Sequence, residues 1–112
     1  MINELPVIID QIKGDETIVR WSKQGWCRMW VKNVLDLLER EAIVGVVVLA
    51  KEVELSPGYW HSYISLVEED CDEVILNGSA YMSTPEYFGV IEEAPEIFKS
   101  GKVDVLIMND RK

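Results

Sequence analysis

The side chains with the clearest capacity for catalysis are the single histidine, His61, and the two cysteines, Cys27 and Cys71. A thiol beside an imidazole can attack a carbonyl carbon, because the histidine takes up the proton of the thiol. Neither cysteine stands in a local catalytic signature, and spacing along the chain does not indicate whether either of them meets His61. We therefore favour an ordinary histidine in an aromatic strand, and we predict no catalytic residue and no enzymatic activity.

The strongest candidate for metal binding is the segment 68–73, in which five of the six side chains are carboxylates. Carboxylate oxygens suit Ca²⁺ or Mg²⁺, yet the segment lacks the ligand order of an EF-hand and the glycine at its sharp turn. A zinc site is disfavoured too, since the chain has one histidine and no Cys-x-x-Cys spacing. We interpret the segment as a solvated acidic loop and predict neither a metal nor a cofactor.

Aromatic and basic side chains alternate in a basic part of the chain, residues 20–32, and recur in the aromatic run 59–63. Flat rings can stack on a base while a guanidinium group holds a phosphate, so a nucleotide-like anion is a candidate ligand. The alternative is that these tryptophans fill a core and the arginine tips point into solvent, and no glycine-rich phosphate-binding motif supports the ligand hypothesis. The residues of this candidate ligand site are Arg20, Trp21, Trp26, Arg28, Trp30, Trp60 and His61.

The net charge of −9 comes almost entirely from residues 52–98, which contain eleven acids and no Lys or Arg. Such a surface repels nucleic-acid backbones and anionic lipid, and it would speed encounter with a basic protein. The preferred hypothesis is a small inhibitor, immunity or anti-defence protein that docks on a basic, nucleic-acid-handling partner, although acidic surface can serve solubility alone. The predicted partner-binding residues are Glu68, Glu69, Asp70, Asp72, Glu73, Glu86, Glu92, Glu93 and Glu96.

The elements that must position these residues begin with two apolar, β-branched runs, 5–12 and 17–21. They predict two strands, which the turn residues 13–16 would join into a hairpin. Residues 26–32 fit both helical spacing and strand alternation, so their structure is left open. The residues over 33–41 are good helix formers, and we expect a helix there.

The middle of the chain predicts a β-hairpin. The run 43–55 is too rich in valine for a comfortable helix and predicts the central strand. A turn at Ser56-Pro57-Gly58 leads into a second strand over 59–67.

Farther along, Asn77-Gly78 predicts a two-residue turn between strands at 74–76 and 79–82. The segment Ser83-Thr84-Pro85-Glu86 combines a cap, a proline in the first turn and a glutamate three residues after the serine. It predicts a helix that begins near residue 84.

That helix would have one apolar side, although Pro95 predicts a kink or break near Ala94 and Gly101 predicts its end. A closing strand is expected over 103–108. The fold class is therefore α+β, a mostly antiparallel sheet of about five to seven strands with two helices. The apolar side of the predicted helix consists of Tyr87, Val90, Ile91, Ala94, Ile97 and Phe98.

At 112 residues, of which 48% are hydrophobic, the chain has the size and composition of one domain, 1–112. The start is acidic and no apolar leader follows it, so we expect a cytoplasmic protein with two reduced thiols. The longest apolar run, 42–50, is too short to span a membrane. A homodimer is an open alternative, because unpaired edge strands and surface tryptophans both support association.

Overall fold

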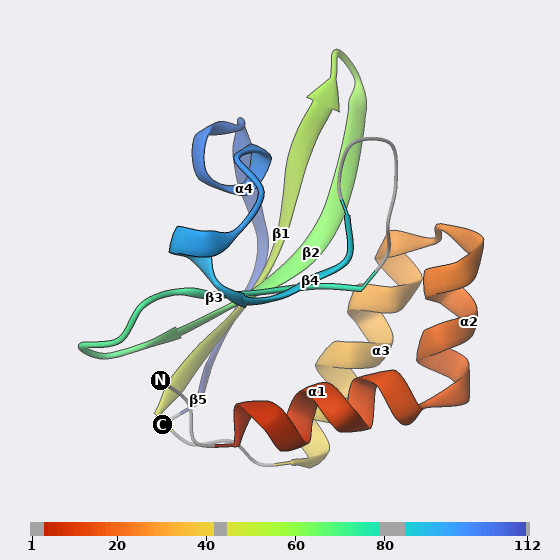
Figure 1. The fold of residues 1–112 in the computed structure, drawn as a ribbon, viewed down its shortest axis with the longest axis vertical. Helices are drawn as coiled ribbons and strands as arrows, with labels where there is room; N and C mark the ends of the chain where they lie inside the picture. Colours follow the sequence, from red (N-terminus) through yellow and green to blue (C-terminus); the bar gives the residue numbers. More distant parts are fainter. Residues whose placement is uncertain (1–3, 42–44, 79–84, 112) are drawn as a thin grey trace.

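The computed structural model of the protein describes residues 4–41, 45–78 and 85–111. For residues 107–111 it describes the backbone alone. Three helices come first and a five-stranded sheet follows (Figure 1). The helices are α1 (Leu5–Gly14), α2 (Glu16–Gln24), α3 (Cys27–Arg40), the 3₁₀ helix η1 (Ile91–Glu93) and α4 (Ile97–Ser100). The strands are β1 (Val46–Ser56), β2 (Tyr59–Glu68), β3 (Val74–Asn77), β4 (Tyr87–Val90) and β5 (Val103–Arg111).

The strands form one sheet in the order β4-β3-β2-β1-β5, and every neighbouring pair is antiparallel. The predicted α+β class with an antiparallel sheet is confirmed, although the described residues form four α-helices rather than two. The hairpin at 56–58 is confirmed as well, with Gly58 at φ 81°. The strand predicted over 43–55 is β1, but its predicted central place is wrong, because β2 is the middle strand of the sheet; the predicted closing strand is β5.

The two strands predicted near the start are wrong, because residues 5–12 lie in α1 and residues 17–21 lie in α2. In α1 the buried side chains are Leu5, Ile8 and Ile12, which recur at the spacing of one helix face. The β-branched composition favoured strands, but burial of an apolar helix face outweighs a propensity of a few tenths of a kcal/mol per residue.

The turn predicted at residues 13–16 joins two helices instead of two strands. Asp15 ends α1, and its carboxylate accepts hydrogen bonds from the backbone N–H groups of Thr17 and Ile18 at 3.0 and 3.1 Å. An aspartate in this position satisfies first-turn amides and starts α2.

Residues 27–32, whose secondary structure could not be predicted as helix or strand, belong to helix α3, and Trp26 is its N-cap. The helix predicted over 33–41 is confirmed as the second part of α3. Gly25 separates α3 from α2 in the left-handed conformation, at φ 71°, which glycine adopts without strain. Cys27 is consequently the first residue of α3. The buried side of α3 consists of Trp30, Val31, Val34, Leu37 and Leu38.

The predictions for residues 74–98 are partly wrong. Strand β3 pairs with β4, and the register Asn77↔Tyr87 replaces the two-residue turn by a longer connection. The expected return strand at 79–82 and the helix start at 83–84 lie outside the described residues. Residues 87–90 are a strand because their backbone pairs with β3 along its whole length, and tertiary pairing overrides the helical periodicity.

The predicted break at Pro95 and the predicted end at Gly101 are both confirmed. Ala94 has an extended backbone at φ −73° and ψ 159°, and only the four residues of α4 follow Pro95 as helix. Gly101 is the C-cap of α4.

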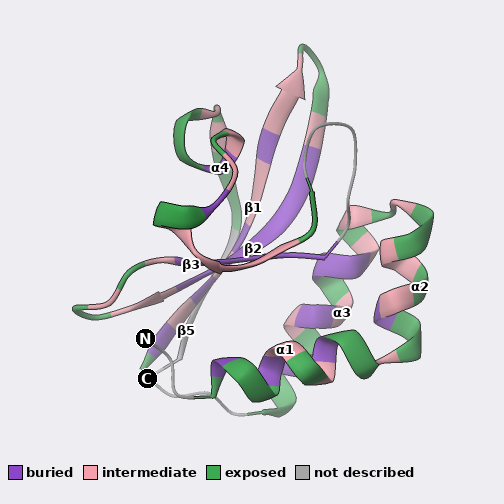
Figure 2. Ribbon diagram, in the orientation of Figure 1, coloured by how far each residue is buried: buried purple, intermediate pink, exposed green. Residues whose placement is uncertain are grey.

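The two faces of the sheet carry separate hydrophobic clusters, and buried residues line the sides of the elements that meet the sheet (Figure 2). Helices α1–α3 cover one face, where Trp30 and Val34 pack with Ile64 and Leu76. Helix α4 covers part of the other face, where Phe98 contacts the ring of Tyr63 edge-on. Within the described residues, no helix is long and apolar enough to cross a membrane.

Candidate functional site

The fold brings together three polar side chains from separate elements: Cys27 of α3, His61 of β2 and Asn77 of β3. The β2–β3 ladder ends at the pair Ile64↔Leu76, and beyond it the backbone N–H of Ser62 donates a hydrogen bond to Cys27 Sγ at 3.3 Å. The start of α3 therefore lies against β2 where the pairing with β3 stops. Cys27 is half-buried, whereas the side chains of His61 and Asn77 are fully buried.

The environment of Cys27 favours its thiolate. Burial alone would raise the pKa of the thiol, but hydrogen bonding from His61 and from the Ser62 backbone, together with the charge of His61, lowers it to about 7. The first turn of a helix favours a negative charge in the same way. A substantial fraction of Cys27 is therefore an anion at neutral pH, when an ordinary thiol is mostly protonated.

Asn77 fixes the orientation of the imidazole. Its amide Nδ2 donates to the backbone carbonyl of Pro85 at 2.8 Å, and because a carbonyl only accepts, Oδ1 must face the other way. Oδ1 lies 2.6 Å from His61 Nε2, so Nε2 carries the hydrogen of that bond. In the neutral ring the lone pair is then on Nδ1, which is buried.

The first turn of α3 supplies hydrogen-bond donors next to the thiol. The N–H groups at a helix start have no partner within the helix, and Trp26, the N-cap residue, has a side chain that only donates. The structure shows no side-chain cap at this end of α3, in contrast to Asp15 at the start of α2. The backbone N–H groups of Cys27, Arg28 and Met29 can therefore donate hydrogen bonds to an anion formed at the thiol.

Sequence reasoning considered Cys27 beside His61 but gave no role to Asn77, which it interpreted as a turn residue. The dipeptide Asn77-Gly78 is the usual sequence of a tight hairpin, and this hid the alternative that the asparagine amide is buried in a hydrogen-bond network. The second cysteine, Cys71, lies in the β2–β3 turn, and the two thiols are not joined by a disulfide.

The predicted ligand-binding tryptophans do not gather at one place. The rings of Trp21 and Trp26 stack at 5.1 Å between centroids, and Trp26, which directly precedes Cys27, is 56% exposed. Trp30 is 1% exposed and lies in the core against Phe88.

The remaining residues of that predicted set also lie apart. Arg20 is exposed on α2, and Arg28 of α3 forms an ion pair with Glu52 at 3.3 Å. Trp60 of β2 lies under the Lys102 ammonium group, 5.6 Å from the ring centroid. His61 is the member that reaches Cys27.

The predicted partner-binding acids fall into two groups. A backbone hydrogen bond of 2.8 Å from Ile91 to Glu73 holds η1 beside the end of the β2–β3 turn (Figure 1). Glu86 lies at the other end of β4. Glu69, Asp70, Asp72, Glu92, Glu93 and Glu96 are exposed, whereas Glu68 and Glu73 are partly buried.

Two lysines offset part of this charge. Lys51 Nζ lies 2.9 Å from the Glu73 carboxylate, which also accepts a hydrogen bond from the Ser65 hydroxyl at 2.6 Å. Lys99 Nζ lies 3.6 Å from the Glu96 carboxylate. In the described ranges no group of three or more His, Cys, Asp or Glu side chains could hold a metal ion.

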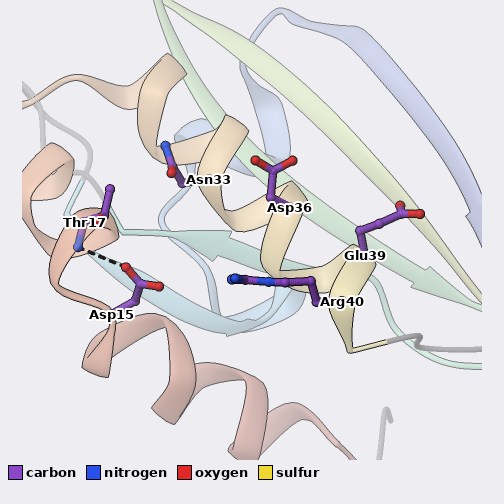
Figure 3. Close-up of a pocket in the computed structure, with 6 residues that line it drawn as sticks. All are labelled: Asp15, Thr17, Asn33, Asp36, Glu39 and Arg40. Atoms are coloured by element: carbon purple, nitrogen blue, oxygen red, sulfur yellow. Dashed lines mark hydrogen bonds between the residues drawn. The ribbon is translucent and has the colours of Figure 1, made fainter.

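A groove of about 410 Å³ lies between the start of α2 and the outer side of α3, away from Cys27. Figure 3 shows the carboxylates of Asp36 and Glu39 and the guanidinium group of Arg40 projecting from α3 there. Asp15 also lines this groove, but its carboxylate is already used to cap α2. The groove is lined by the hydroxyl-bearing Thr17 but by no cysteine and no histidine, so Cys27 and His61 lie outside it.

No protein-family model, curated protein or solved structure matches this chain. The functional assignment therefore rests on the geometry of the site.

Proposed function

We propose that the protein is a cysteine-dependent acyl-transfer enzyme that hydrolyses an amide or ester bond. The observation that carries the proposal is the chain of contacts from Cys27 through His61 to Asn77, at the start of α3. A nucleophile, a base and a group that orients the base are the three parts that nucleophilic acyl transfer requires. Sequence alone favoured a non-enzymatic protein because it could not place these residues together.

In the first half of the reaction, Cys27 Sγ attacks the carbonyl carbon of the substrate and a tetrahedral oxyanion forms. The first-turn N–H groups of α3 stabilise this oxyanion, a contribution that reaches about 3 kcal/mol for a single donor. The bond to the leaving group then breaks, and His61 Nδ1 gives its proton to the departing amine or alcohol. The product of this half is a thioester on Cys27.

In the second half, water attacks the thioester while His61 Nδ1 accepts a proton from it. The carbon–sulfur bond breaks and the acid is released, so the sum is one bond hydrolysed by one water. Asn77 holds the imidazole in one orientation throughout, because its own amide is held by the Pro85 carbonyl.

The proposal is tested by incubating the protein with p-nitrophenyl acetate and digesting it after a few seconds. We expect a burst of p-nitrophenol and an acetyl group on the peptide that contains Cys27, detected by mass spectrometry. The Cys27→Ala variant is expected to lose the burst, and Cys71→Ala, the matched control, is expected to retain it. Acetylation confined to Cys71, or an unchanged burst in Cys27→Ala, would contradict the proposal.

A second candidate function is docking of the acidic end on a basic protein. The observation in its favour is that exposed acids of the β2–β3 turn and of η1 lie beside one another through the Ile91–Glu73 hydrogen bond. Binding to a basic nuclease that weakens steeply as salt rises is the result this candidate requires. Absence of binding at low salt would count against it.

A further inference from the structure

We propose that the groove between α3 and the sheet selects the substrate, and that it takes an acyl group with an apolar chain that ends in a carboxylate. This inference rests on the proposed function, because it assigns a substrate class to the Cys27 nucleophile.

The groove is placed to hold the acyl part of a substrate. It has a volume of about 260 Å³ and is lined by Arg28, which follows the nucleophile in α3, and by Ser62. The backbone N–H of Ser62 is the donor that contacts Cys27 Sγ at 3.3 Å. An acyl chain lying in this groove would thus have its carbonyl carbon next to the thiol.

The walls of the groove are apolar. Val31 and Leu35 lie one turn apart on the same side of α3, and Ala50 of β1 and Leu106 of β5 face them from the sheet. Leu106 is 47% exposed, a large apolar side chain that a bound chain would cover. Aliphatic walls of this kind favour methylene groups over polar ones.

The rim of the groove is cationic, although the chain as a whole has a net charge of −9. Arg28 forms an ion pair with Glu52, in which the arginine side chain is 77% exposed and the glutamate side chain is 13% exposed. Lys32 is exposed and takes part in none of the ion pairs of the described part of the chain. The acids Asp36 and Glu39 of α3 line the groove of Figure 3.

A carboxylate is therefore the group that complements this rim. The ammonium group of Lys32 would attract an anion at the far end of the chain, while acidic surface elsewhere on the molecule would repel it. This combination defines the occupant as an apolar acyl chain with a terminal negative charge.

The test compares three maleimides as thiol probes in the Cys71→Ala background, where Cys27 is the one remaining cysteine. They are N-ethylmaleimide, N-hexylmaleimide and 6-maleimidohexanoic acid, with each rate divided by the rate of the same probe with glutathione. We expect the hexanoic acid probe to react about tenfold faster than N-ethylmaleimide, an effect equal to burial of about two methylene groups. N-hexylmaleimide should lie between the two.

Two variants distinguish the contribution of the Lys32 charge from that of the apolar walls of the groove. Lys32→Glu is expected to remove the advantage of the hexanoic acid probe over N-hexylmaleimide, and Leu35→Asp is expected to remove the advantage of both long probes. Lys23→Glu, which changes an exposed lysine that lines a different groove, is the matched control and should alter neither ratio.

Equal normalised rates for the three probes would overturn the inference. The ratios between probes report on the groove, and the absolute rate of N-ethylmaleimide at pH 7 reports on the thiolate. A fast short probe without selectivity would therefore refute the groove and leave the proposed function standing. A slow reaction of every probe would refute the proposed function.

Discussion

Replacing His61 with glutamine is expected to slow the acylation of Cys27 at pH 7 by about 10²- to 10⁴-fold, the usual contribution of a positioned acid–base group. Glutamine keeps a polar group that can bond to Asn77, but it neither accepts the thiol proton nor gives one to the leaving group. The measurement is the rate of the p-nitrophenol burst in rapid mixing. Because removal of His61 also removes a stabilising charge, the thiolate fraction falls together with the rate of proton transfer.

A purely structural role for His61 would give a different result. Ser65→Ala is the matched control, since it also removes a buried hydrogen-bonded group of β2, in this case the 2.6 Å bond to Glu73, away from Cys27. We expect Ser65→Ala to lower the melting temperature with little change in the burst rate. If His61→Gln lowered the burst no more than Ser65→Ala does, the imidazole would have no part in the chemistry.

Replacing Gly78 with alanine is expected to destabilise the fold by about 3 kcal/mol, the upper end of what overpacking usually costs. A Cβ at this position would lie 2.3 Å from atoms of the Trp30 indole, which is 1% exposed. Gly78 also accepts a hydrogen bond from the Ser22 hydroxyl through its carbonyl oxygen. The expected result is a lower midpoint in urea denaturation with an unchanged slope.

Gly14→Ala is the control for this prediction. No atom lies within 4 Å of a Cβ at Gly14, the last residue of α1, and alanine there should stabilise the helix by about 0.5 to 1 kcal/mol. Since Gly78 follows Asn77, we also expect Gly78→Ala to slow the burst, because a shift of β3 moves the amide that orients His61. A variant as stable as the wild type would show that Trp30 does not pack against this backbone.

The sequence predicted the sheet better than the helices that surround it. The hairpin of β1 and β2 has a proline–glycine turn and β-branched strands, so local preference and final structure agree there. In α1 the same β-branched residues lie in a helix, because burial of Leu5, Ile8 and Ile12 on one face decides the conformation. In β4 the reverse holds, since pairing with β3 overrides an amphipathic helical pattern.

The candidate site could be predicted only in part. Cys27 and His61 were recognised as a potential pair, but their meeting depends on where α3 begins, and residues 26–32 fitted either secondary structure. Once Gly25 ends α2 and α3 starts at Cys27, the thiol is at a helix N-terminus. Asn77 could not be recognised, because its role depends on a long-range contact with His61 and on the carbonyl of Pro85.

The pH dependence of Cys27 alkylation by iodoacetamide tests the central claim most directly. In the Cys71→Ala background the rate should rise with pH and reach half its maximum near pH 7, because the pKa of the thiol is lowered to about 7 and the thiolate is the reacting form. In His61→Gln the half-maximum should move to about 8.5 or above, because the hydrogen bond and charge of His61 are lost while burial still raises the pKa of the thiol. A midpoint near 8.5 in the protein with His61 intact would contradict the account.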